Sequence, residues 1–118
     1  MKIIVTRDSV TAGDDVAAPH RRAFEFTDGT SLLDALAAIS RSNYLANISG
    51  GRATWSAVSG VPLAVIAQEW DCPQNLLQGT EESIDIRNAI IHIHFNYHVQ
   101  INPDAVFEVL RGLRLKAY

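Results

Sequence analysis

The stretch Ile91-His92-Ile93-His94-Phe95-Asn96-Tyr97-His98-Val99-Gln100-Ile101 separates its side chains by odd and even position. The odd positions are all apolar, whereas the even positions hold three of the four histidines of the chain together with an asparagine and a glutamine. A β-strand directs successive side chains to opposite faces, so this pattern predicts one long strand with a buried face and a solvated face.

Further strands are predicted around this one. Residues 2–7 and 23–27 are β-rich, and 52–58 is a third such run. The run 62–70 is almost continuously apolar, which predicts burial on both of its faces. Between Ser83 and Ile90 the isoleucines lie at even positions, whereas from Ile91 onward they lie at odd positions. Because a shift of one residue turns every side chain to the other face, we expect a bulge or break at 87–89.

Two helices are expected. Thr30 or Ser31 can cap a helix that runs to Arg41, with Asp34 near its positive end. Asn102-Pro103-Asp104 is a typical helix start. An apolar stripe follows it at Val106, Val109, Leu110 and Leu113.

The predicted fold class is α+β. We expect a β-grasp-like, mixed, mostly antiparallel sheet of about five strands, with helix 31–41 packed on the apolar face of 91–101 and a C-terminal helix added. A chain of 118 residues is expected to form a single domain over 1–118. A net charge of −3 gives no reason to expect nucleic acid as a partner. No run has the ~20 apolar residues needed to span a membrane, and the N-terminus does not resemble a signal peptide, so a cytoplasmic protein is expected.

The segment Phe24-Glu25-Phe26-Thr27-Asp28-Gly29-Thr30-Ser31-Leu32-Leu33-Asp34-Ala35-Leu36, preceded by a strand at 1–5, resembles the start of a plant-type [2Fe–2S] ferredoxin domain. The resemblance covers about the first forty residues and implies the β-grasp fold. In that family a loop with cluster cysteines follows the helix, but here residues 42–51 contain no cysteine. Ligation of the cluster needs about four cysteines, and Cys72 is the only one in the chain, so an iron–sulfur cofactor is not expected.

The solvated face of the 91–101 strand is the first candidate contact surface. Residues 8–22 form a connection that is long for a hairpin, and long connections often contribute to binding. We therefore predict a partner-binding surface made of both segments, namely Asp14, Asp15, His20, His92, His94, Asn96, His98 and Gln100.

His92 and His94 also have the spacing of a metal-binding pair. Their side chains leave one strand face about 6.5–7 Å apart, which lets two imidazoles reach one zinc or copper ion. A third ligand would come from elsewhere, for example from His20, Asp71 or Cys72. The alternative is a polar sheet face that meets solvent or a partner.

No complete catalytic motif is present in the sequence. Cys72 stands beside a proline and is expected to be a half-buried small residue, and Trp55 and Trp70 are expected to pack in the core or at its rim. We therefore predict a non-enzymatic module that binds another protein, such as an immunity protein that neutralises a toxin. The alternative from another class is a zinc or copper protein centred on His92 and His94. A homo-oligomer that uses the open sheet face as its interface is a third hypothesis.

Overall fold

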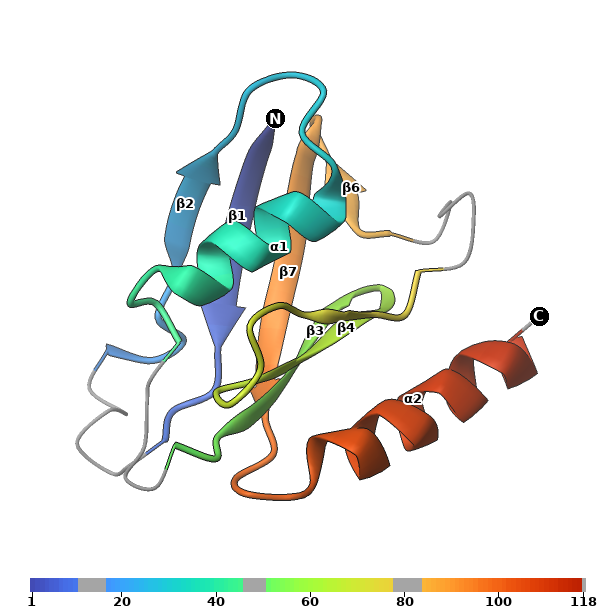
Figure 1. Ribbon diagram of the computed structural model, residues 1–118. Coiled ribbons are helices and arrows are strands. Elements are labelled where there is room, and N and C mark those ends of the chain that lie inside the picture. Colours follow the sequence, from blue (N-terminus) through green and yellow to red (C-terminus); the bar gives the residue numbers. More distant parts are fainter. Residues whose placement is uncertain (11–16, 46–50, 78–83, 118) are drawn as a thin grey trace.

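The computed structural model describes residues 1–10, 17–45, 51–77 and 84–117, the last five of these by their backbone alone. It contains a mixed sheet of seven strands and two helices (Figure 1). The elements are β1 (Lys2–Arg7), β2 (Arg22–Glu25), α1 (Leu32–Arg41), β3 (Thr54–Ser59), β4 (Val61–Ala67), β5 (Gln74–Asn75), β6 (Ile86–Arg87), β7 (Ile90–Tyr97) and α2 (Pro103–Ala117). The predicted α+β class is confirmed, and the two strands beyond the expected five are β5 and β6, each of two residues.

The strands lie in the order β2-β1-β7-β3-β4-β5, and β6 pairs with β7 next to β3. β1 and β7 run parallel, and every other pair is antiparallel. The two ends of the chain therefore supply neighbouring strands in the middle of the sheet.

The apolar side of β7 faces α1, as the alternation predicts. Ile93 and Phe95 are buried in one cluster with Leu36 and Ile39 of α1, and Ile3 of β1 belongs to the same cluster. Figure 1 shows α1 lying across β1 and β7. This layer is the main core of the described structure.

The second helix covers a different part of the sheet. A separate buried cluster contains Val65 of β4, Val106 of α2 and Leu76, which follows β5. The residues of β4 from 63 to 67 are all buried, as predicted for the run 62–70. The strand ends at Ala67, earlier than predicted, and Glu69 beyond it is exposed. The helix α2 lies on the face of the sheet opposite to α1, where it packs on β4 and to a smaller extent on β3. On that face it does not cover β1 and β7.

The strand predicted over 91–101 is shorter than expected. It ends at Tyr97, because Val99 has a positive φ of 57° and the N–H of Ile101 donates to the carbonyl of His98 over 3.1 Å. The chain thus turns toward α2, and Val99 and Ile101 are 57 % and 55 % exposed instead of buried. The prediction was wrong for the last four residues, since alternation alone does not reveal a turn.

The predicted break in phase at 87–89 is present as a hairpin. Asn88 and Ala89 have φ values of 53° and 62° and connect the paired residues Arg87 and Ile90. Two successive residues with positive φ are typical of the type I′ turn that joins antiparallel strands. The turn reverses the chain and accounts for the change of phase.

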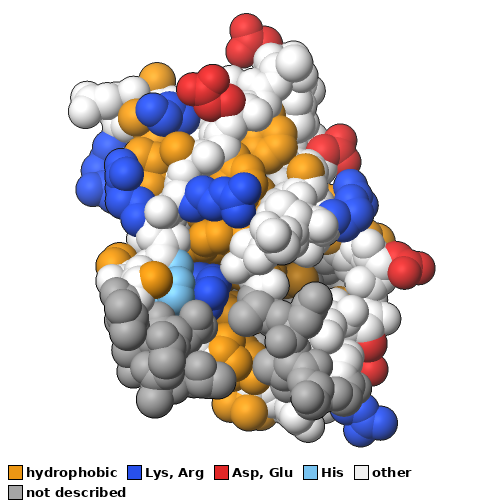
Figure 2. Space-filling model, turned by 90° about the vertical axis from the view of Figure 1, so that its left-hand side faces the viewer, with side chains coloured by type: hydrophobic (Ala, Val, Ile, Leu, Met, Phe, Trp, Pro, Cys, Tyr) orange, Lys and Arg blue, Asp and Glu red, His pale blue; other side chains and the backbone are white. Residues whose placement is uncertain are grey.

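The strand β2 forms one edge of the sheet. Three of its four residues are exposed, Arg22 among them, and its Phe24 packs on the main core. Figure 2 looks at this side of the molecule and shows several Lys and Arg side chains gathered between apolar ones.

Both helices begin as predicted. The Ser31 hydroxyl accepts a hydrogen bond from the N–H of Asp34 over 3.1 Å, and the side-chain oxygen of Asn102 accepts one from the N–H of Asp104 over 2.8 Å. Such caps satisfy N–H groups that have no partner within the helix. Within the described residues, neither helix has the length and apolar character required to cross a lipid bilayer.

The cap of α1 can be tested by replacing Ser31. Ser31→Ala is expected to lower the free energy of unfolding by about 1 kcal/mol, because the N–H of Asp34 loses its acceptor. Urea denaturation measures the change. Ser31→Asp keeps an acceptor oxygen and is the matched control, so an equal loss in both variants would contradict the assignment of the cap.

Candidate functional site

The polar side of β7 forms a surface with the neighbouring strands. Thr6 of β1 is paired with His94, and Ser56 of β3 is paired with Asn96, so these side chains leave the same face of the sheet. Asp8 lies two residues beyond Thr6 and continues that row. We call this surface the imidazole face and define it as Thr6, Asp8, Ser56, His92, His94, Asn96 and His98.

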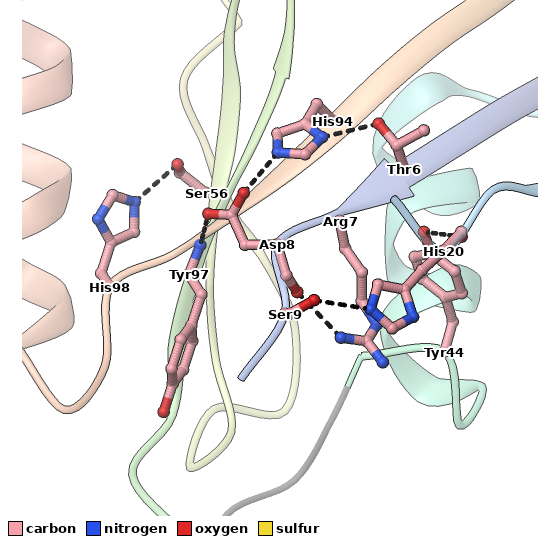
Figure 3. Close-up of polar contacts among 10 residues, drawn as sticks. All are labelled: Thr6, Arg7, Asp8, Ser9, His20, Tyr44, Ser56, His94, Tyr97 and His98. Atoms are coloured by element: carbon pink, nitrogen blue, oxygen red, sulfur yellow. Dashed lines mark hydrogen bonds and ion pairs between the residues drawn. The ribbon is translucent and has the colours of Figure 1, made fainter. Parts of the chain in front are cut away.

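The ring of His94 is held at both nitrogens (Figure 3). Its Nε2 lies 2.8 Å from Oδ1 of Asp8, and its Nδ1 lies 2.7 Å from Oγ1 of Thr6. An ionised carboxylate only accepts hydrogen bonds, so Nε2 of His94 donates to Asp8. When the ring is neutral, Nδ1 accepts a hydrogen bond from the Thr6 hydroxyl. The ring spans the gap between two side chains on the adjacent strand, and its orientation is therefore fixed.

Asp8 connects several parts of the imidazole face. Its backbone N–H donates to the carbonyl of Phe95 over 3.0 Å, which holds it beside β7. Its Oδ2 accepts from the N–H of Tyr97 over 2.9 Å, while its Oδ1 is bonded to His94. Partial burial raises the pKa of Asp8, but the hydrogen bonds from Tyr97 and His94, and the positive charges that His94 and His98 carry when protonated, together lower it from its usual value of 3.8. Asp8 therefore stays ionised at neutral pH.

His98 lies just past the end of β7 and is also fixed. Its Nε2 is 2.8 Å from the hydroxyl of Ser56, and its backbone N–H donates to the carbonyl of Thr54 over 2.8 Å. Burial lowers the pKa of His98 from 6.5, because a charged ring is less well solvated there, and the negative charge of Asp8 opposes this effect. His98 is thus kept neutral over a wider pH range than an exposed histidine.

A hollow of about 300 Å³ opens on the same side of the sheet. At this hollow Asp85 and Arg87 form an ion pair, with Nε of Arg87 3.1 Å from Oδ1 of Asp85. The polar side chains that line it are Thr6, Ser59, Asp85, Arg87, His92 and His94. His92 and His94 therefore face one hollow, as their spacing predicts, and that hollow offers both donors and acceptors.

The chemistry available to this surface is chiefly hydrogen bonding. In the part of the chain that the structure describes, no three His, Cys, Asp or Glu side chains are grouped so that they could hold a metal ion. Both nitrogens of His94 already have partners, so a metal there would have to replace Thr6 or Asp8. The expectation of zinc or copper at His92 and His94 stays a prediction that metal analysis can test.

The other predicted site residues lie apart from the imidazole face. His20 lines a hollow with Arg7 and Tyr44, and Gln100 lines a hollow with Arg52. Asp71 and Cys72 border a third hollow near the end of α1. The structure therefore does not bring His20, Asp71 or Cys72 beside His92 and His94. Asp14 and Asp15 lie outside the described residues.

Two members of the imidazole face, Thr6 and Ser56, were not predicted, and Asp8 was predicted only as the first residue of the connection 8–22 and not as a partner of His94. Thr6 and Ser56 come from strands whose pairing with β7 depends on the register of the sheet, and Asp8 directly follows one of these strands. The available signal was the position of Thr6 and Asp8, two residues apart at the end of a predicted strand. That signal becomes useful only when the parallel pairing of β1 with β7 is known.

No family model, curated protein or solved structure matches this chain. The resemblance of its first part to ferredoxin-like β-grasp domains therefore stays a prediction, and the geometry described above carries the functional argument.

The arrangement of Asp8 and His98 predicts a measurable titration. The His98 ring should titrate below 6.5 in the folded protein, and Asp8→Asn should lower its midpoint further, because the opposing negative charge is lost. NMR of the ring protons against pH measures both midpoints. The unfolded chain takes up this proton near pH 6.5 and the folded chain only at lower pH, so the stability that His98 contributes is lost as pH falls through that interval.

Thr6→Val is the matched control for this titration. It removes the other hydrogen bond of His94 but keeps the charge of Asp8, so the midpoint of His98 should stay where it is in the unmodified protein. A midpoint at or above 6.5 in the unmodified protein would contradict the burial of His98.

Proposed function

We propose that this chain is a non-enzymatic module that binds another protein through its imidazole face. The observation that carries the proposal is the fixed hydrogen-bonding pattern of His94 with Thr6 and Asp8, on the part of the sheet that α2 does not cover. Figure 1 shows α2 beside β4 and away from β1. The surface that remains is extended along two central strands, a shape that fits a protein better than a small molecule.

The side chains of this face are suited to recognition because they are already ordered. Thr6, Asp8 and His94 form one connected set of hydrogen bonds, and Ser56 and His98 form a second. Ordering a mobile side chain at an interface costs about 0.5–1.5 kcal/mol, and this cost is smaller where the side chain is fixed before binding. The half-buried histidines also offer apolar ring surface beside their polar nitrogens.

The charge of the surface favours a partner with basic or hydrogen-donating groups. Asp8 remains ionised at neutral pH, and burial favours the neutral form of His98. The net charge of the chain is −3, which is compatible with a basic partner. As one specific form of this function, we propose that the chain acts in the cytoplasm as an immunity-type protein that binds and neutralises a toxin.

The decisive variant is Asn96→Arg, which places a long charged side chain in the middle of the imidazole face. It should weaken partner binding at least tenfold, or about 1.4 kcal/mol, because the new charge is buried in the contact without a matching group. Ala38→Arg is the matched control, since it adds the same side chain at an exposed position of α1. The proteins retained by the three immobilised chains are compared, and each candidate is then purified and titrated by calorimetry.

Two further measurements complete this test. Thermal unfolding shows whether Asn96→Arg is still folded, and size-exclusion chromatography with light scattering shows whether the partner is a second copy of the chain. A purified partner that binds the Asn96→Arg chain as tightly as the Ala38→Arg chain would overturn the proposed surface.

A further inference from the structure

The hollow that His20 lines with Arg7 and Tyr44 lies on the other side of the sheet, at the end of β1, and three arginines line it. Its volume is about 330 Å³. Arg7 comes from the end of β1, Arg22 from the start of β2, and Tyr44 from the segment after α1. The described residues that line it are Arg7, Ala17, His20, Arg21, Arg22, Asn43 and Tyr44. We call it the arginine hollow.

The segments around the arginine hollow are tied together by hydrogen bonds (Figure 3). The Tyr44 hydroxyl donates to the carbonyl of His20 over 2.7 Å, and Nε2 of His20 lies 3.1 Å from the hydroxyl of Ser9. The backbone N–H of Arg7 donates to the carbonyl of Pro19 over 3.0 Å. His20 has a φ of 61°, a conformation that non-glycine residues adopt only where the surroundings hold it.

The guanidinium of Arg7 is the most enclosed charge in this hollow. The residue is only 9 % exposed, its Nη1 donates to the carbonyl of Asp8 over 2.9 Å, and its Cζ lies 5.8 Å from the centre of the Tyr44 ring. Arg22 is exposed, and its Cζ lies 4.9 Å from the centre of the Phe24 ring. The floor of the hollow is thus a buried cation, and exposed arginines stand at its rim.

The charged side chains among the described lining residues of the arginine hollow are all arginines. Burial raises the pKa of Tyr44 to about 12, and the positive charges of Arg7 and Arg22 act against that rise. The described lining residues include no Asp or Glu. Figure 2 shows Lys and Arg side chains gathered on this face and most Asp and Glu side chains toward its margin. Because the whole chain has a net charge of −3, this positive region is local.

We propose that the arginine hollow binds a phosphate group, either as inorganic phosphate or at the end of a small phosphomonoester. The planar guanidinium forms paired hydrogen bonds with phosphate oxygens, and the three arginines among the lining residues favour a phosphate dianion over a carboxylate with a single charge. Asn43 and His20 add polar groups to the lining. The site is separate from the imidazole face, so the proposal does not depend on the protein-binding function.

The test is a titration of the full chain with inorganic phosphate and, separately, with glycerol phosphate. Ionic strength is held constant with sodium chloride, and NMR follows the arginine side-chain N–H and the backbone amides of Arg22 and Tyr44. Saturable shifts with a dissociation constant of about 1 mM or below are expected. The ligand that binds more tightly identifies the source of the phosphate group.

Variants separate this site from general charge effects. Arg22→Gln should weaken binding about tenfold, because a hydrogen bond between charged groups is lost, and Arg22→Lys should weaken it less because the charge is kept. Arg52→Gln is the matched control, since it removes the same charge from an exposed position at another hollow. Shifts that do not saturate, or an equal loss of affinity in Arg22→Gln and Arg52→Gln, would overturn the proposal.

Discussion

The parallel pairing of β1 with β7 is the contact on which the rest of the structure depends. It joins Lys2 to Ile90 at one end and Arg7 to Phe95 at the other. Parallel neighbours need a long connection between them, and here that connection includes α1, β3 and β4. The pairing therefore joins the first strand of the chain to the last. It also places Thr6 and Asp8, from one end of the sequence, beside His94 from the other.

The unequal cover of the two faces explains where polar residues are found. On one face α1 packs across β1 and β7, and the residues there are apolar, such as Ile93 and Phe95. On the other face α2 packs on β4, where Val65 is fully buried. The same face of β7 is half-buried, so His92, His94 and Asn96 occupy it without the large desolvation cost of a closed core. A polar surface thus follows from the placement of one helix.

Much of the fold could be predicted from local patterns, because alternation and helix caps are short-range signals. The two faces of β7, the cap at Ser31 and the helix start at Asn102 are all of this kind. The turn at Val99 could not be predicted, since an apolar residue at an odd position continues the alternation while its φ of 57° ends the strand.

The candidate site was predicted only in part, because it depends on contacts between residues far apart in the sequence. The histidines of β7 share one strand, so their common face follows from the sequence. The partners that fix their rings are Thr6, Asp8 and Ser56, and which of these meets which histidine depends on the register between strands. A shift of β1 by one residue would place Thr6 and Asp8 on the opposite face. Sequence patterns give the composition of such a face but not its hydrogen bonds.

Arg7 links the position of β1 in the sheet to the arginine hollow. Alternation in β1 places Arg7 on the same side as Ile3 and Val5, toward the apolar core, although its side chain is charged. Burial of a guanidinium normally costs several kcal/mol unless polar groups compensate it, so a leucine would be expected at such a position. The conflict is resolved at the end of the strand, where the guanidinium meets the carbonyl of Asp8 and the ring of Tyr44. Positions where a chain breaks the local rule of its own fold are the ones where binding is expected, and Arg7 is such a position.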